Sequence, residues 1–197
     1  MLNQVTIVLS NLPCNHYIHR VVGKDQTKDL LKFLKPFSDE KKAAVLWLRD
    51  FVWDLYPQCN ELIYDNYNAL AFGWSPTEKV GHTFCSIAIG RTSKNIHFGF
   101  YWGSEIKDPK KMLIGEGNQY RYILVEDVRL FPAEYMEKLL KDAYANSMDK
   151  VKDVKLIRNG LTITKSVSEK KRTVKKKVKK KDSVKRRRSQ KGRTSQK

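Results

Sequence analysis

The amino-acid sequence predicts an α+β fold with N-terminal helices, a four- to five-stranded antiparallel sheet and a C-terminal helix. Apolar residues recur at helical spacing up to residue 57, short aromatic and β-branched runs follow up to residue 125, and helical spacing returns after Pro132. The connections between the runs are short, which favours antiparallel neighbours because parallel strands need long crossovers. With 41% hydrophobic and 11% aromatic residues among 197, the chain can bury a core of its own.

Residues 1–24 are predicted to be an N-terminal extension whose structure the sequence leaves open. Val5, Ile7 and Leu9 have the spacing of one face of a strand. No Lys or Arg precedes this apolar start, so it lacks the charged region of a signal peptide. No stretch approaches the roughly 18–20 apolar residues of a membrane-spanning helix, and the 3 cysteines are too scattered for a disulfide framework. We therefore expect a cytoplasmic protein with no membrane span; the sequence leaves its oligomeric state open.

Two helices are predicted after this extension. Thr27 can cap a short helix that Pro36 ends. Ser38 begins a longer helix that Pro57 ends. The apolar stripes expected to face the core are Leu30, Leu31 and Leu34 in the first helix and Ala44, Leu48, Phe51, Val52 and Leu55 in the second. Both helices are therefore predicted to belong to the core scaffold.

Four strands are predicted in the middle of the chain, at residues 69–74, 84–90, 95–101 and 120–125. A helix then begins at Pro132, whose fixed φ suits the first helical position. Its apolar stripe consists of Met136, Leu139, Leu140, Ala143 and Tyr144. Residues 149–164 are predicted to form a β-hairpin, because Asn159-Gly160 supplies the two positive φ angles that its turn needs.

Several motifs in the middle of the chain form an ordered series. They are Leu62-Ile63-Tyr64-Asp65-Asn66-Tyr67-Asn68-Ala69-Leu70, Cys85-Ser86-Ile87-Ala88-Ile89, Phe98-Gly99-Phe100, Gly103, Asp108-Pro109 and Leu113-Ile114-Gly115-Glu116-Gly117. In this order they resemble the YdhG-like family, small bacterial domains of unknown function with a frataxin-like α+β fold. The resemblance spans residues 38–148 and implies that residues 25–148 form a YdhG-like domain. Where the family often has Lys and then Arg-His, this chain has Asn118 and Arg121-Tyr122, so no role of that Lys or His carries over.

The resemblance implies one alternative activity, that of a frataxin-type iron carrier, because frataxin-like domains bind iron through carboxylates on the first helix and the sheet edge. The longer predicted helix offers Asp39, Glu40, Asp50 and Asp54, mixed with Lys41, Lys42 and Arg49. Hard cations need several converging oxygen ligands, and only the pair at positions 50 and 54 shares a helix face. The sequence therefore favours a charge-balanced helix surface over an iron site.

The aromatic residues of the predicted strands raise a second alternative, a small-ligand pocket. Alternation sends about half of the strand side chains to each face of a sheet. If the face away from the helices is concave, Asp65, Tyr67, Asn68, Trp74 and Arg121 would line an apolar pocket with a few polar anchors. If not, the aromatics are core residues, which is the interpretation that their general role in cores favours. A cavity bordered by residues 67, 74 and 121 would distinguish the two.

Other patterns predict neither a metal site nor a catalytic site. Cys14-x-His16-x-x-His19 offers three ligands but lacks the second half of a zinc site. Gly115-Glu116-Gly117 lacks the third glycine of the dinucleotide fingerprint and the Lys-Ser/Thr of the P-loop, so a loop is predicted there. No cofactor is predicted, and we expect a binding or interaction module rather than an enzyme.

Charge divides the chain at residue 165. Residues 165–197 hold 17 Lys or Arg against 2 acidic residues, a net charge of +15, whereas residues 1–164 hold 22 against 19, a net charge of +3. The basic clusters consist of Lys170, Lys171, Arg172, Lys175, Lys176, Lys177, Lys179, Lys180, Lys181, Arg186, Arg187 and Arg188. This tail has no aromatic residue and cannot bury enough surface to offset its ordering entropy, so it is predicted to be disordered.

A tail of this composition predicts a polyanionic partner, because each lysine that neutralises a phosphate releases condensed counterions. Most of the charge is Lys, which contacts phosphates as a point charge and reads bases poorly. We predict non-specific binding of DNA or RNA through residues 165–197, with a nucleoid-associated location in a bacterium. A nuclear-import signal, a solubilising tail and attraction to anionic membranes are the alternatives that the sequence leaves open.

Overall fold

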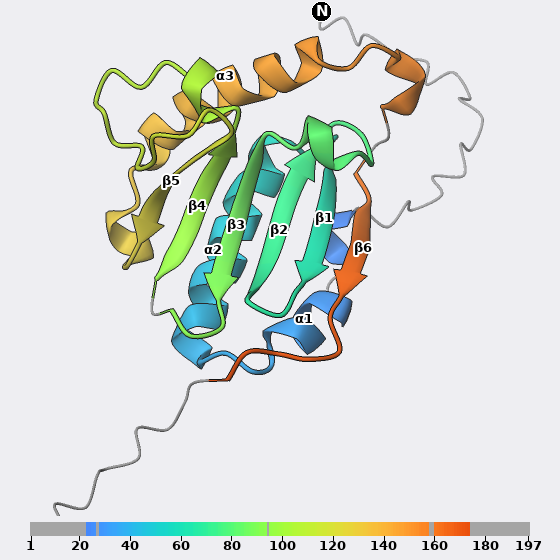
Figure 1. Cartoon of the computed structure of the whole chain (residues 1–197), viewed down its shortest axis with the longest axis vertical. Coiled ribbons are helices and arrows are strands. Elements are labelled where there is room, and N and C mark those ends of the chain that lie inside the picture. Colours follow the sequence, from blue (N-terminus) through green and yellow to red (C-terminus); the bar gives the residue numbers. More distant parts are fainter. Residues whose placement is uncertain (1–22, 27, 94, 158–159, 174–197) are drawn as a thin grey trace, which may run out of the picture.

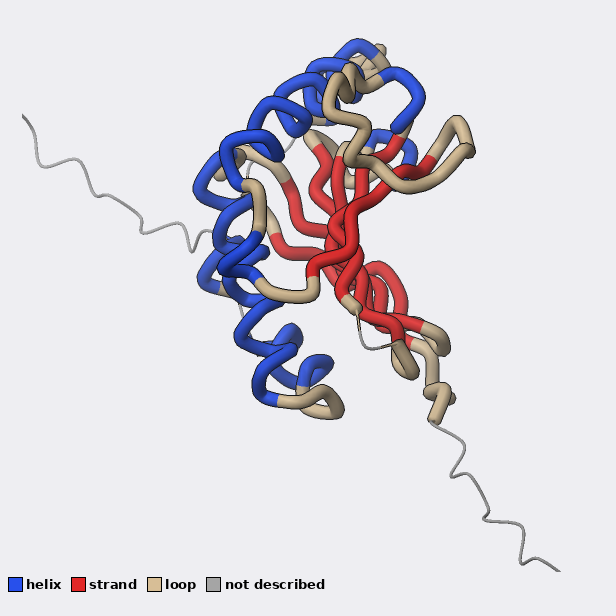
Figure 2. The backbone as a smooth tube through the Cα atoms, turned by 90° about the vertical axis from the view of Figure 1, so that its left-hand side faces the viewer, coloured by secondary structure: helices blue, strands red, loops and turns tan. Residues whose placement is uncertain are grey.

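The computed structural model describes residues 23–26, 28–93, 95–157 and 160–173, which form a two-layer α+β fold (Figure 1). A six-stranded sheet makes one layer. The other layer contains α1 (Lys28–Leu34), α2 (Asp39–Leu55) and α3 (Ala133–Asp149). Figure 2 shows that these helices lie on one side of the sheet only, so the opposite face has no helix over it. The predicted α+β class and the three predicted helices are confirmed.

The sheet is mixed and has the strand order β5-β4-β3-β2-β1-β6. Its strands are β1 (Asn60–Asp65), β2 (Ala69–Ser75), β3 (Cys85–Gly90), β4 (Ile96–Tyr101), β5 (Tyr120–Val125) and β6 (Thr162–Val167). Strands β1 to β5 form an antiparallel meander, whereas β6 pairs with β1 in parallel. The four predicted strands correspond to β2–β5, and β1 and β6 complete the sheet beyond the predicted number.

The predicted β-hairpin at residues 149–164 is wrong. Residues Val154–Leu156 form a short 3-10 helix, and β6 pairs with β1, a partner 101 residues away in the sequence, rather than with the segment before it. Asn159, in the predicted turn, lies outside the described residues. Pairing with β1 is favoured because it fills a sheet edge and brings the Thr162 hydroxyl to the buried Glu61 carboxylate, 2.8 Å away.

Both predicted boundaries of the body also shift. Residue 165, the expected start of the tail, lies inside β6, and the described chain continues to Thr173. Gly23 and Lys24, assigned to the N-terminal extension, belong to the body, since the Gly23 amide donates to the Gly160 carbonyl at 2.7 Å. The clusters from Lys175 onward, and the Cys14–His19 motif, lie outside the described residues.

The core lies between the sheet and the helices. Inward-facing aromatic residues of the sheet layer are Phe72, Trp74, Phe84, Phe98 and Phe100, all fully buried. In α2 the buried apolar positions are Val45, Leu48, Val52 and Trp53, whereas Leu55, predicted to face the core, is 36% exposed. The buried face of α2 is therefore turned about the helix axis relative to the predicted apolar stripe. None of the helices in the described part of the chain has the length and apolar character needed to cross a membrane.

A buried ion pair explains this rotation of α2. Arg49 faces the sheet and is 1% exposed, and its guanidinium donates to both carboxylate oxygens of Glu61 in β1, at 2.7 and 2.8 Å. The remaining donors of Arg49 reach the carbonyls of Lys24 at 2.9 Å and Gly23 at 3.1 Å. Because a buried charge is tolerated only when it is paired and hydrogen-bonded, this contact fixes the N-terminal segment, α2 and β1 against one another.

Candidate functional site

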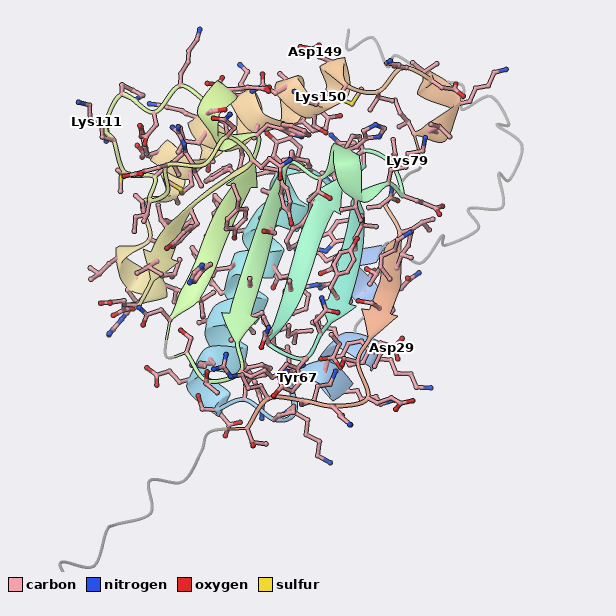
Figure 3. The ribbon with its side chains drawn as sticks, viewed as in Figure 1. Asp29, Tyr67, Lys79, Lys111, Asp149 and Lys150 are labelled. Carbon is pink, nitrogen blue, oxygen red and sulfur yellow. The ribbon has the colours of Figure 1, made fainter. Side chains whose placement is uncertain are left out.

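Residues 168–173, the first residues of the C-terminal segment after β6, cross the end of the sheet next to α1. We call these residues the root of the tail. After β6, the Ser168 amide donates to the Asp65 carbonyl at 2.8 Å, and the Arg172 amide donates to the Tyr67 carbonyl at 2.9 Å. Figure 3 shows Tyr67 at this end with Asp29 of α1, while Lys79 lies at the opposite end of the sheet. Residues 168–173 are therefore held along the β1–β2 turn.

Asp65 is the central residue of this end. It is 4% exposed, and its carboxylate is hydrogen-bonded to the Arg91 guanidinium and lies 2.8 Å from the Lys171 ammonium. The same ammonium donates to the Asp65 carbonyl at 2.5 Å, and the Arg91 guanidinium lies 5.2 Å from the centre of the Phe37 ring. Two cations thus compensate one buried carboxylate. Lys171, predicted to contact nucleic acid, pairs with Asp65 while its side chain remains 29% exposed.

A cavity of about 310 Å³ adjoins this ion pair. It is lined by Asp29, Lys32, Phe33, Pro36, Asp65, Arg91, Thr164, Val167 and Lys171. A second cavity, of about 490 Å³, continues along the contact between α1 and β6 and shares Asp29 and Thr164 with the first. The linings mix both signs of charge, so neither cavity is selective for an anion or a cation on charge alone.

Basic side chains outnumber acidic ones around the root of the tail. Residues 28–42 and 168–173 contain the basic residues Lys28, Lys32, Lys35, Lys41, Lys42, Lys170, Lys171 and Arg172 and the acidic residues Asp29, Asp39, Glu40 and Glu169. The paired Arg91 and Asp65 add one charge of each sign. Lys41 reaches across to the Ser93 carbonyl at 2.5 Å, which brings the start of α2 next to the β3–β4 turn. The surplus of positive charge on this end adjoins the more strongly basic residues that follow in the sequence.

The uncovered face of the sheet carries a second cluster, made of Tyr64, His97, Tyr101, Tyr120 and Tyr122. The His97 and Tyr122 rings are stacked with centroids 4.3 Å apart, and the Tyr122 and Tyr120 rings follow at 5.9 Å. Tyr101 meets Tyr120 edge to face at 5.6 Å. We call these five residues the aromatic cluster. Its members stand on β1, β4 and β5, at the two sides of the sheet.

Burial shifts the pKa values of this cluster. Desolvation raises the pKa of Tyr120 to about 12, although a hydrogen bond with Ser86 opposes it. Desolvation also raises the pKa of Tyr101 and of Tyr64, and it lowers the pKa of His97. Burial therefore favours the uncharged forms of Tyr64, His97, Tyr101 and Tyr120. The Tyr64 hydroxyl is buried and has no hydrogen-bond partner among the described residues.

Small residues occupy the two central strands between these aromatic side chains. Strand register puts Ala71 of β2 beside Ala88 of β3, and Gly73 beside Ser86, on the same face as the cluster. Ser86 in turn pairs with Gly99, where an added Cβ would meet the Tyr120 hydroxyl at 2.1 Å. The rings of β4 and β5 therefore lean over backbone that has almost no side chains.

The predicted ligand pocket is not assembled by the fold. Asp65 and Asn68 both contact Arg91, whose guanidinium pairs with the Asp65 carboxylate and whose amide donates to the Asn68 carbonyl at 2.8 Å. Tyr67 belongs to the same turn, and its carbonyl accepts from the Arg172 amide. Trp74, however, is fully buried on the helix side of β2, packed against Trp53, and Arg121 lies on β5, three strands away from β2. Five cavities on the described part of the body have other linings, and none of these five joins Tyr67, Trp74 and Arg121. Only the part around Asp65 persists as a site.

The candidate iron ligands on α2 do not form a cluster. Asp50 and Asp54 share one cation, since the Lys24 ammonium lies 3.9 and 2.5 Å from their carboxylates. Asp39 pairs with Lys42 at 2.9 Å. No group of three or more His, Cys, Asp or Glu side chains suited to a metal ion occurs within the described ranges. Three of the four helix carboxylates thus pair with neighbouring lysines rather than with one another.

The remaining reactive side chains have packing roles. Burial raises the pKa of Cys59 to about 12 and that of Cys85 well above its ordinary value, which keeps both as thiols. His82 hydrogen-bonds through Nδ1 to the hydroxyl of the buried Thr77 at 2.8 Å. That hydroxyl also accepts from the Lys79 amide at 3.1 Å, so it closes the β2–β3 connection.

Comparisons with known proteins leave the functional conclusion to this geometry. No family model matches the chain, and neither the curated proteins nor the solved structures give a match.

Proposed function

We propose that the protein binds DNA or RNA non-specifically through its C-terminal basic segment, and that the YdhG-like body is a binding module that holds the root of this segment. The observation that supports the proposal is the attachment of residues 168–173 to the β1–β2 turn, at the end of the body where basic side chains are in surplus. The basic clusters of the sequence follow directly from this attached root.

The attachment makes the body and the tail one electrostatic surface. Lys175 is two residues beyond Thr173, so a fully extended chain separates them by about 7 Å at most. Extended chain of about 10 Å at most joins Lys175 to the exposed Arg172. A polyanion bound to Lys175-Lys176-Lys177 would therefore lie about one Debye length, about 8–10 Å, from Arg172. Within this footprint, Lys171 already pairs with the Asp65 carboxylate.

The test measures affinity for a 20-base-pair duplex against salt concentration by fluorescence anisotropy. In the full chain, about eight phosphate contacts give a log–log slope near −7. Replacing Lys175, Lys176 and Lys177 with Gln should reduce the magnitude of that slope by up to about 2.7, at about 0.9 per contact.

The matched control replaces three exposed lysines on the α3 side of the body, Lys138, Lys141 and Lys155, with Gln. Both variants lose the same formal charge, so the proposal requires the tail variant to lose far more affinity than the control. Equal losses, or a tail variant with an unchanged slope, would show that the tail does not carry the binding.

A further inference from the structure

The uncovered face of the sheet has a composition that packing of this body does not require. Within strands β1 to β5, the side chains on this face are Asn60, Leu62, Tyr64, Ala69, Ala71, Gly73, Ser75, Ser86, Ala88, Gly90, His97, Gly99, Tyr101, Tyr120, Tyr122 and Leu124. None of these is Lys, Arg, Asp or Glu. Asn60, Leu62 and Ser75 are fully buried, so the accessible part of this face consists of the aromatic cluster, Ala69, Ala71, Ala88, Gly90 and Leu124. Charged residues are the usual occupants of the solvated part of a sheet face, so an accessible area of neutral aromatic and small residues points to a binding surface.

The residues of the aromatic cluster are partly accessible to solvent, and stacking fixes the orientation of three of their rings. All five rings keep some accessible surface, and Leu124, opposite His97 in the register, is 39% exposed beside them. The stacking of His97, Tyr122 and Tyr120 holds their rings within 12° and 24° of parallel. A flat ligand therefore meets preformed π surfaces next to a strip of Ala and Gly, with little side-chain entropy to lose.

The neutral sheet face and the basic C-terminal segment together indicate which kind of flat ligand would bind. The face is neutral, whereas the segment rooted at its α1 end is strongly basic, and Tyr67 of the β1–β2 turn contacts that root. A ligand with neutral aromatic groups on a polyanionic backbone satisfies both surfaces at once. Single-stranded nucleic acid has this composition, because its unpaired bases expose the π faces that a duplex buries.

We propose that the uncovered sheet face stacks the unpaired bases of a single-stranded nucleic acid, while the basic tail contacts its phosphates. This inference rests on the proposed nucleic-acid binding and narrows its partner from any polyanion to a single strand. Tyr122 and His97 are the primary stacking residues, because their rings form the closest stacked pair of the cluster, with centroids 4.3 Å apart.

The experiment compares three probes of equal phosphate number on the unaltered protein: a single-stranded oligothymidine, an abasic strand of the same length and a duplex. Stacking contributes enough per base that the thymidine strand should bind at least about tenfold more tightly than the abasic strand. Equal affinity for these two probes overturns the inference, since phosphates alone then account for binding. Duplex binding that depends on the tail would still leave the proposed function in place.

Two variants locate the contact. Tyr122→Leu and His97→Val should each reduce the preference for thymidine over abasic strand severalfold and leave duplex affinity unchanged. Tyr67→Leu is the control, because this tyrosine is 48% exposed but lies in the turn outside the face. If the control lowers the preference as much as the two variants do, the face is not the stacking surface. The probe comparison on the unaltered protein stands even if a variant folds poorly.

Discussion

The two faces of the sheet divide the aromatic residues by type. The helix side of the strands holds Phe72, Trp74, Phe98 and Phe100, all fully buried, whereas the uncovered side holds tyrosines and His97. Phe fills volume without a polar group to satisfy, while Tyr and His keep one end that tolerates water. The aromatic residues of the covered face therefore exclude water, whereas those of the uncovered face tolerate partial exposure to solvent.

Charged residues lie on the covered face of the sheet, although that face is the drier of the two. The covered face contains both buried carboxylates of β1, Glu61 and Asp65, each paired with cations, and the uncovered face of β1 to β5 has no charged residue. The ion pairs connect distant segments of chain to the sheet, so charge serves assembly on one face. On the uncovered face, the absence of charged residues leaves a surface that suits neutral groups.

Breaking the Arg49–Glu61 pair should produce the largest effect. Glu61→Gln leaves the guanidinium buried without its counter-charge, which costs about 3–5 kcal/mol of unfolding free energy. The matched control, Asp54→Asn, removes an exposed partner of Lys24 and should cost less than about 1 kcal/mol. Urea unfolding of both variants measures the difference. Similar values for the two would mean that the buried pair contributes no more than a surface one.

A smaller effect is expected from adding one methyl group to the uncovered face. In Gly99→Ala, the new Cβ lies 2.1 Å from the Tyr120 hydroxyl oxygen, so that ring must leave its place between Tyr101 and Tyr122. The cost should be about 1–2 kcal/mol, because the clash is with a side chain that can move rather than with backbone. Gly81→Ala, with open space around its Cβ, should change stability by less than about 0.5 kcal/mol. An unchanged near-ultraviolet tyrosine signal in Gly99→Ala would contradict this.

The smallest effect is a stability loss in alkali. The pKa of Tyr120 is about 12 in the folded protein and about 10 in an unfolded chain, so above pH 10 the folded state binds the extra proton. Its contribution is complete below pH 10 and is lost as the pH rises towards 12. Tyr120→Phe should therefore reduce the fall in unfolding free energy between pH 8 and pH 11 by about 1 kcal/mol. Parallel pH profiles for the two proteins would contradict this assignment.

The sequence predicted the elements whose signal is local. The helices, the four strands β2 to β5 and the segregation of strand aromatics to two faces follow from periodicity, which depends only on neighbouring residues. Strand β6 was assigned to a hairpin because Asn159-Gly160 is a strong turn signal, and its true partner is 101 residues away. Arg49 was left out of the α2 stripe for the same reason, since only Glu61 of another element makes its burial tolerable.

The candidate site was predicted in part. Asp65, Tyr67 and Asn68 lie close together because they are neighbours at the β1–β2 turn, whereas Trp74 and Arg121 were added on aromatic and charge content alone. Their strand positions point Trp74 into the core and put Arg121 on β5, which composition does not reveal. The pairing of Asp65 with Lys171 joins residues 106 apart, a contact that no local pattern encodes.

The parallel pairing of β1 with β6 has a consequence for how the protein is made. During synthesis, β1 leaves the ribosome about 100 residues before β6, so its outer edge stays without its native partner for several seconds at usual elongation rates of about 5–20 residues per second. Contacts of such sequence separation slow folding, because a long loop must close before they form. The docking of β6 on β1 therefore completes the sheet and fixes the root of the tail in one late step of folding. A chain released before residue 167 carries an open sheet edge.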